Sequence, residues 1–298
     1  MQSILITGAT GTIGMEVVRY LYPYSKGRKI RVGARSIQRS RSKLRAFPGL
    51  EYRLFDFEDS HTFQEAFKHV EILFLMRPPH ISRVQRVFLP LLREAKAAGI
   101  QKVVFLSVQG AERSSIIPHR KIEQLIEQLG LNFIFIRPSY FMQNLTTVFL
   151  RSITQHQRIE LPLGKAKLNW VDSFNVSEYC AQVLLYFNQY QNRAFDITGT
   201  ENKNFQEVVE LIQSETGIPV RYKSINPFSF FIKKVKEGHS MSYALVFTLL
   251  HFLPRLQAEP KISQVYENLT GKKPTSLQEF LSREKPVLRE STRRICRL

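Results

Sequence analysis

The feature that most constrains this chain is a glycine-rich turn that stands between an apolar run and an amphipathic segment near its start. Residues 2–8 predict a buried strand, and residues 12–22 predict a helix with one apolar face. The turn between them carries Gly8, Thr10, Gly11, Thr12, Ile13 and Gly14. A strand, a tight turn and a helix in this order open an α/β sheet in which the helix amides face a ligand's phosphates.

Each glycine of the turn has a use in binding a dinucleotide. Gly8 permits the tight turn, Gly11 lets phosphate oxygens approach the backbone, and Gly14 brings the helix close to the strand. The alternative is a tight turn with a purely structural role. Because strand, turn and helix follow one another in the right order, we expect the residues of this turn to bind a pyrophosphate.

The alternation of strands and helices continues through the first half of the chain. Strands are predicted at residues 29–35, 51–56, 70–76, 102–107 and 132–137, and helices at 61–69, 82–98 and 118–129. Helices between strands favour parallel pairing, so the predicted fold class is α/β, a doubly wound parallel sheet of the Rossmann type. We expect a nucleotide-binding domain at residues 1–150, with sheet and helix returns at about 169–198. A smaller, mostly helical substrate-side lobe is expected at residues 199–298.

The end of the second predicted strand indicates which dinucleotide is preferred. NAD-specific proteins place an acid there, on the ribose 2′-hydroxyl. This chain has no carboxylate between Glu16 and Glu51, and Arg35 ends the strand. Further basic residues follow at Arg39, Arg41, Lys43 and Arg45. Because a guanidinium can bind a 2′-phosphate through two hydrogen bonds, Arg35 predicts NADP(H) rather than NAD(H). The alternative, a solvated basic loop, describes Arg41 and Arg45.

The ends of later strands supply the other candidate cofactor contacts. Asp56 and Phe57 follow the third strand and are expected to border the adenine. Met76, Arg77 and Pro78 end the fourth strand, where open parallel sheets bind ligands, and are expected to flank the nicotinamide-side ribose. An exposed Arg77 without a ligand contact is the alternative.

Ser107 ends the fifth predicted strand at the same edge of the sheet. Its hydroxyl is a candidate for contact with substrate or nicotinamide. A hydroxyl that only initiates the following turn is the equally weighted alternative.

Composition and charge limit the setting in which such a protein acts. The 298 residues carry 43 Lys and Arg against 25 Asp and Glu, a formal net charge of +18, which favours anionic partners. Basic residues do not follow one helix with interleaved aromatics, so nucleic acid is not favoured. The two cysteines predict neither a disulfide framework nor a metal site. With no signal peptide, and with its longest apolar stretch, residues 243–253, too short to span a bilayer, the chain is expected to be cytoplasmic.

Several segments together are similar to one known family. They are the GATGTIG turn, the Arg that ends strand two, Asp56-Phe57, the LMRPP segment at 75–79 and Ser107. His119-x-x-x-Glu123, the IRPSYFMQN segment at 136–144 and the LTGKKP segment at 269–274 add to them. The chain resembles the NmrA-like branch of the atypical short-chain dehydrogenases/reductases over nearly its whole length. The resemblance implies a nucleotide-binding domain, a small C-terminal lobe and a substrate cleft between the two.

Activities in that family divide into two kinds. Some members are NADPH-dependent reductases of quinones, azo compounds and related acceptors, and others are dinucleotide-binding regulators that have lost catalysis. Most short-chain dehydrogenases use a Tyr and a Lys four residues later for proton transfer, and this chain lacks the pair. The corresponding helix carries His119 and Glu123 one turn apart, and His119 is a candidate proton donor near neutral pH. A helix-start side chain in solvent is the alternative for His119.

Tyr140, Phe141 and Asn144 follow the sixth strand and are expected to bind a flat conjugated acceptor through an aromatic wall and one amide. The alternative is that the aromatic side chains belong to the core. We therefore predict an NADPH-dependent oxidoreductase acting on a small, quinone-like acceptor. The alternative is a catalytically weak NADP(H)-sensing regulator that acts through a protein partner; a homodimer is also compatible with the sequence.

Two C-terminal segments lie outside the predicted cofactor and acceptor sites. Residues 227–253 mix phenylalanines with lysines, a pattern compatible with a lid, an oligomer interface or a membrane-surface patch. A core-facing stripe whose lysines reach back to solvent is the favoured interpretation. Basic residues gather from Arg283 to Arg297, and the terminus with Arg289, Arg293, Arg294 and Arg297 is expected to be a mobile, solvated tail.

Overall fold

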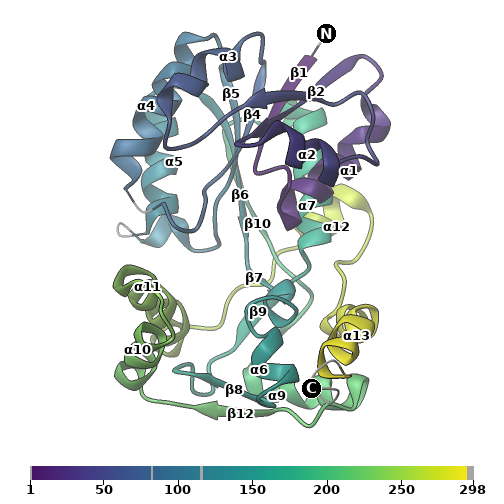
Figure 1. Cartoon of the computed structure of the whole chain (residues 1–298), viewed down its shortest axis with the longest axis vertical. Coiled ribbons are helices and arrows are strands. Elements are labelled where there is room, and N and C mark those ends of the chain that lie inside the picture. The colour runs from purple at the N-terminus through teal and green to yellow at the C-terminus, as the bar shows by residue number, and fades with distance from the viewer. Residues whose placement is uncertain (1, 82, 115–116, 294–298) are drawn as a thin grey trace. The chain divides into compact units, whose positions relative to one another are not determined.

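A computed structural model describes residues 2–81, 83–114 and 117–293 of the chain (Figure 1). The chain divides into two compact units. The first comprises residues 1–138, 173–197 and 268–270, and the second comprises residues 139–172, 198–267 and 271–298.

The first unit is built on a seven-stranded sheet in the order β10-β6-β5-β4-β1-β2-β3, in which every pair of neighbours is parallel. Its strands are β1 (Gln2–Thr7), β2 (Arg28–Ala34), β3 (Glu51–Leu54), β4 (Ile72–Met76), β5 (Lys102–Leu106), β6 (Asn132–Pro138) and β10 (Arg193–Ile197). Central strands such as β4 are apolar without interruption because both of their faces are buried. The predicted doubly wound parallel sheet is confirmed.

Helices cover both faces of this sheet (Figure 1). On one face α1 (Thr12–Leu21) packs on α7 (Ser173–Leu185), and the short α8 (Phe187–Tyr190) follows α7. On the other face lie α3 (Phe63–Phe67), α4 (Val84–Ala97) and α5 (Pro118–Gln128). A further helix, α2 (Ile37–Lys43), follows β2.

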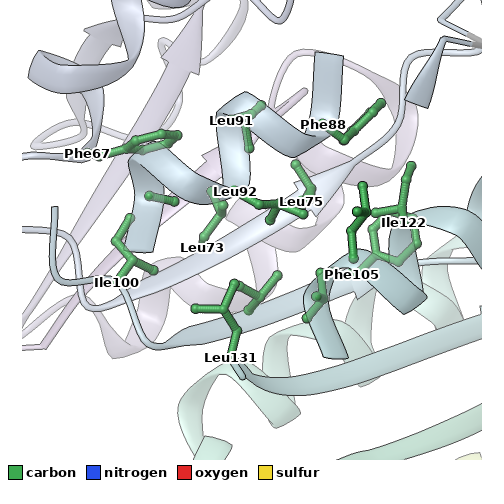
Figure 2. Packing of buried hydrophobic residues seen from close by; sticks show 14 of the residues in the cluster. Phe67, Leu73, Leu75, Phe88, Leu91, Leu92, Ile100, Phe105, Ile122 and Leu131 are labelled. Carbon is green, nitrogen blue, oxygen red and sulfur yellow. The ribbon is translucent and has the colours of Figure 1, made fainter. Parts of the chain in front are cut away.

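The face under α3, α4 and α5 holds a continuous apolar core (Figure 2). Phe67 of α3, Leu92 of α4 and Ile122 of α5 meet Leu73 of β4 and Phe105 of β5, and all five are completely buried. Each such side chain contributes roughly 1.5–3 kcal/mol when it leaves water. This packing holds the strands in register and thereby fixes the positions of their carboxyl ends.

The order of the strands determines at which point of the sheet's edge a ligand is expected to bind. From β1 the chain runs outward to β2 and β3 and then returns to β4 on the other side of β1. Ligands of open α/β sheets bind beyond the carboxyl ends of the strands at such a reversal. Gly8 follows β1 at this edge, and Met76 ends the neighbouring β4.

The second unit contains two small sheets, ordered β11-β9-β7 and β12-β8. Their strands are β7 (Tyr140–Phe141), β8 (Arg158–Leu161), β9 (Leu168–Val171), β11 (Asn202–Lys203) and β12 (Arg221–Ser224). The helices are α6 (Leu150–Thr154), α9 (Phe205–Thr216), α10 (Pro227–Lys236), α11 (Met241–Phe252) and α13 (Leu277–Arg293), while α12 (Val265–Thr270) contributes residues to both units.

Trp170 of β9 lies at the centre of the second unit's own core. Its side chain is fully buried, and its indole Nε1 donates a hydrogen bond to the carbonyl of Lys203 at 3.0 Å. Phe205 packs edge-on against the Trp170 ring, with 5.2 Å between ring centroids. The bond satisfies the one polar atom of the indole, which therefore packs in an apolar core at little cost.

The expectation of a mobile tail at Arg289 and beyond is wrong for the part of the tail that the structure describes. Helix α13 continues to Arg293, because Leu288 is buried one heptad after the buried Leu281 and holds this part of the helix on the unit. The Arg289 guanidinium donates to the carbonyl of Thr216 at the end of α9, at 2.9 Å. Arg294, Cys296 and Arg297 lie outside the described residues.

Candidate functional site

The glycine turn after β1 has little room for side chains. Gly8 has φ +64°, a conformation that L-residues with side chains rarely adopt, and its carbonyl accepts the amide of Gly11 at 2.9 Å. A Cβ on Gly14 would lie 2.3 Å from the Gly8 carbonyl oxygen. Helix α1 therefore comes so close to the end of β1 that only glycine is accommodated at position 14.

The first turn of α1 leaves backbone amides available. Gly11 is the N-cap, no side chain of the described residues caps the helix, and no acid occurs in its first turn. Gly11 and Thr12 are exposed. The first amides of a helix have no partner within the helix, and they carry the positive end of its dipole. The turn thus presents backbone donors that suit an anion.

Strand β4 closes the other side of this turn. The Thr7 hydroxyl donates to the carbonyl of Phe74 and accepts the amide of Met76, both at 3.0 Å, so it ties the ends of β1 and β4 together. The Met76 side chain lies against Gly8, where a Cβ would come within 2.7 Å of the methionine Cε. Met76, a predicted cofactor contact, therefore stands directly beside the glycine turn.

We expect Gly14→Ala to lower the free energy of unfolding by about 1–3 kcal/mol, because the new methyl group would overlap the Gly8 carbonyl and push α1 off the strand. Urea denaturation measures the change. Gly11→Ala is the matched control: its Cβ would lie 3.4 Å from the same oxygen, so the loss should stay below about 1 kcal/mol. Equal losses in both variants would contradict this account of the turn.

Arg35 stands where β2 ends, and its side chain is exposed. The basic segment that follows is helical: the Ser36 hydroxyl accepts the amide of Arg39 and caps α2. The expected basic loop is therefore wrong at Arg41, whose guanidinium lies 5.2 Å from the centre of the Tyr52 ring. Among the described residues no carboxylate pairs with Arg35, so its charge is available to a ligand.

Asp56 and Phe57 both have contacts within the fold. The Asp56 carboxylate accepts the amide of Glu58 at 3.1 Å. The Phe57 ring packs against Phe55 and Phe88, with ring centroids 4.9 Å and 5.7 Å away, and is half-buried. These contacts hold the segment after β3 in place, and the adenine role of the two residues stays a prediction.

Arg77, which directly follows β4, contacts His119, the second residue of α5. Arg77 Nε donates to His119 Nε2 at 3.4 Å, and the same guanidinium donates to the carbonyls of Pro78, Pro79 and Ile81. Burial, and then the nearby Arg77 charge, lower the pKa of His119 to about 3. The imidazole is therefore neutral at pH 7, and with Nε2 accepting, its proton is on Nδ1.

This pairing changes the chemistry expected of His119. A neutral ring donates a hydrogen bond from Nδ1 but is not a reservoir of an acidic proton near neutral pH. Burial also lowers the pKa of Arg77, yet a guanidinium remains charged at neutral pH. Since no carboxylate of the described residues forms an ion pair with Arg77, the pair places a positive charge, rather than an imidazolium, at this edge.

Ser107 adds an unsatisfied hydroxyl at the same edge of the sheet. It directly follows β5, is 2% exposed, and its Oγ has no hydrogen-bond partner among the described residues. Its amide donates to the carbonyl of Ile136 at 2.7 Å, so the backbone is held while the hydroxyl is not. Buried hydroxyls without partners are uncommon and suit contact with a ligand.

Glu123, one turn after His119, has a structural role. It is fully buried, and its carboxylate accepts two hydrogen bonds from Arg137 of β6, both at 2.9 Å, and one from Arg120 at 3.2 Å. The bidentate pair fastens α5 to β6. It thereby positions the helix that carries His119.

The predicted acceptor-binding residues belong to the second unit. Tyr140 and Phe141 form β7, and Asn144 lies in the turn of 3₁₀ helix that follows at Met142–Leu145. All three side chains are half-buried, and the Asn144 side chain hydrogen-bonds the Tyr140 hydroxyl. Burial raises the pKa of Tyr140, so the phenol stays protonated.

His251 of α11 completes this cluster and was not singled out by the sequence patterns. The ring is fully buried; Nδ1 donates to the carbonyl of Phe247 at 2.8 Å, and Nε2 accepts the Tyr140 hydroxyl at 2.9 Å. Burial lowers the pKa of His251 to about 4. The only sequence signal was a histidine inside an otherwise apolar run, which does not reveal a partner 111 residues away.

Folding stability should fall as the pH drops below about 6.5, because the unfolded chain then protonates His251 while the folded chain resists this until about pH 4. Between pH 7 and pH 4 this one group contributes on the order of 3 kcal/mol to the loss. His251→Gln should flatten that slope, as measured by urea denaturation across the pH range. His61→Gln, at an exposed position, is the control, and an unchanged slope in the His251 variant would refute the prediction.

A model of the NmrA-like family matches residues 1–281. The chain belongs to the NmrA-like family. It is 30% identical over 278 residues to prestalk A differentiation protein A of Dictyostelium discoideum, covering 93% of this chain and 91% of that protein. It is also 30% identical over 287 residues to the uncharacterized oxidoreductase YesF of Bacillus subtilis, covering 93% of each. The predicted family is therefore confirmed.

Solved structures with the same fold include proteins crystallised with a nicotinamide dinucleotide. The NADPH complex of the quinone oxidoreductase QOR2 of Escherichia coli matches with a TM-score of 0.82 at 19% identity, covering 94% of this chain and 99% of that one. NmrA, a negative transcriptional regulator in complex with NADP, matches with a TM-score of 0.73 at 15% identity, covering 97% of each chain. At these identities the likeness shows the shared fold.

Proposed function

We propose that this chain binds NADP(H) at the glycine turn of its first unit and reduces a small conjugated acceptor of the quinone type. The observation that carries the proposal is the uncapped, acid-free start of α1, pressed against β1 at a position where only glycine fits. Such a turn has little structural reason to leave its amides open, and a pyrophosphate satisfies them. Membership of the NmrA-like family supports the same function.

The residues that would hold the cofactor lie along the carboxyl edge of the first unit's sheet. The pyrophosphate would contact Gly8, Thr10, Gly11, Thr12, Ile13 and Gly14. Arg35 would bind the 2′-phosphate, Asp56 and Phe57 would border the adenine, and Met76, Arg77 and Pro78 would flank the nicotinamide side. When bound, NADPH supplies a hydride to the acceptor.

The chain's own residues would then stabilise the negative charge that the reduced acceptor carries on oxygen. Arg77 offers a partly buried positive charge, and neutral His119 offers the Nδ1 proton as a hydrogen-bond donor. The free Ser107 hydroxyl is a third donor. Because reduced quinone oxygens can be protonated by water, this arrangement does without the Tyr and Lys pair of other short-chain dehydrogenases.

Arg35→Ala should weaken NADPH binding about 10- to 100-fold, because a charged hydrogen bond to the 2′-phosphate is worth roughly 1.5–3 kcal/mol, and it should leave NADH binding nearly unchanged. Calorimetric titration of both nucleotides measures this. Arg45→Ala, which removes an exposed arginine just beyond α2, is the matched control. A loss of equal size for both nucleotides would overturn the assignment of Arg35.

Quinone-dependent NADPH oxidation tests the reaction. We expect Arg77→Gln to lower kcat about 100-fold, as removal of a preorganised charge-stabilising donor does, and His119→Ala to lower it about tenfold because a neutral donor is lost. Lys121→Gln, on the exposed side of α5, should have no effect and serves as the control. If the Arg77 variant and the His119 variant both keep wild-type turnover, the pair has no part in catalysis.

The second candidate function is an NADP(H)-sensing regulator that acts through a protein partner. The absence of the Tyr and Lys pair from α5, together with the neutral state of His119, favours it. Saturable NADPH binding without oxidation by any quinone or azo acceptor would support the regulator and exclude the reductase.

A further inference from the structure

The second unit presents a helix whose solvent side is made of aliphatic side chains. In α11 the buried positions Ala244, Thr248 and His251 recur every three to four residues and face the unit's core. The opposite side, here called the aliphatic face, consists of Leu245, Val246, Leu249, Leu250 and Leu253, which are 39–57% exposed. Met241–Phe252 contains no Asp, Glu, Lys or Arg.

The aliphatic face has no function in holding α11 in the fold. Helices α10 and α11 lie side by side and pack through Phe230 and Phe247, whose rings stack with centroids 5.8 Å apart (Figure 1). Met241 at the start of α11, Phe228 of α10 and Leu256 after α11 are also exposed. The expected core-facing stripe is correct at Phe230, which is 1% exposed, and wrong at Phe228, which is 70% exposed. Contiguous exposed apolar surface of this kind marks an interaction site.

The segment of the chain that carries the aliphatic face is basic. Residues 217–258 contain six basic side chains, Arg221, Lys223, Lys233, Lys234, Lys236 and Arg255, and one acid, Glu237. Lys233 and Lys234 have ion pairs with Glu160 and Glu237. Within the described part of the chain, Lys236 and Arg255 pair with no carboxylate. The surface therefore combines apolar area with uncompensated positive charge.

A hollow of about 290 Å³ follows the aliphatic face at the end of α11. It is lined by Lys165, Lys167 and Arg255, with Glu259 as its one acid. Lys167 pairs with Glu259 at 3.1 Å, which leaves two cations of the lining without a carboxylate among the described residues. The hollow suits a small anionic group such as a phosphate.

We propose that the aliphatic face docks this protein on an anionic lipid bilayer. The five aliphatic side chains enter the boundary between headgroups and acyl chains, while Lys236, Arg255 and Lys165 meet lipid phosphates. A second copy is a poorer occupant, because it would bring two strongly basic segments together. A specific protein partner is a poorer occupant, because the four leucines and one valine of this face offer it no hydrogen-bonding side chain. Among the described residues no helix is long and apolar enough to span the bilayer, so the contact is peripheral.

Vesicle flotation with the full-length protein tests the proposal. We expect partitioning onto vesicles of phosphatidylcholine with about 30 mol% phosphatidylglycerol to exceed that onto pure phosphatidylcholine at least tenfold, and to fall as salt is raised. The variant Leu245→Gln/Leu250→Gln should lower partitioning about 100-fold, because two leucines no longer enter the lipid. Absence of binding to the anionic vesicles would overturn the proposal.

The matched control is Leu54→Gln/Val148→Gln, which replaces two side chains of similar exposure, 53% and 48%, on other elements. It should bind as the wild type does, and an equal loss in both double variants would overturn the assignment to this face. A charge variant, Lys236→Glu/Arg255→Glu, gives a second test if the leucine variant proves unstable. It should bind anionic vesicles at least tenfold more weakly, with Lys121→Glu as its control, and unchanged binding would refute the role of the basic rim.

Sedimentation velocity tests the alternative that the aliphatic face binds a second copy of the chain. If the wild type is a dimer that Leu245→Gln/Leu250→Gln converts to a monomer, and vesicles are not bound, the face is an interface between two copies and the lipid proposal is wrong. The bilayer proposal is supported if wild type and variant sediment as species of the same size and if flotation depends on the two leucines.

Discussion

The contact between α1 and the carbonyl of Gly8 is the constraint on which the candidate site depends. Because a Cβ at position 14 would come within 2.3 Å of that oxygen, the helix start is set directly beyond the end of β1. The Thr7 hydroxyl then ties β1 to β4, which brings Met76 beside the turn. The open amides of α1 and the end of β4, where Arg77 follows, are therefore parts of one rigid edge.

Electrostatics at this edge differ from those of a dehydrogenase that relies on an acidic tyrosine. The Arg77 charge and the burial of His119 both oppose an imidazolium. The fold thus keeps one permanent cation, Arg77, beside a neutral His119 at this edge. A guanidinium cannot give up its proton, so its contribution is charge stabilisation rather than proton transfer. Acceptors whose reduced oxygens exchange protons with water match that limitation.

The sequence was sufficient to predict those parts of the fold that depend on local residue patterns. Uninterrupted apolar strands, amphipathic helices and the glycine turn gave the parallel sheet and the positions of its carboxyl ends. Strands of two to four residues, such as β7, β8, β11 and β12, are too short to show a period, and they were missed. Helix α2 was missed because its arginines and lysine were interpreted as a loop, although Ser36 is a sound N-cap.

Contacts between distant residues were beyond reach of the sequence. His119 could be placed on a helix, but its neutral state follows from Arg77, 42 residues earlier. Tyr140 could be placed after a strand, but its bond to His251 depends on how α11 folds back. The direction of the leucines of α11 was likewise undecided, since a helix that is apolar all round gives no period to show which side is covered.

The path of the chain limits how the two units can be separated from each other. The chain passes from one unit to the other five times, at residues 138, 172, 197, 267 and 270. Neither unit is a continuous stretch of sequence, and strand β10 joins its sheet only after the second unit has begun. No single proteolytic cut or gene truncation yields either unit whole. During synthesis the seven-stranded sheet therefore stays incomplete until β10 has emerged, after the first segment of the second unit, residues 139–172.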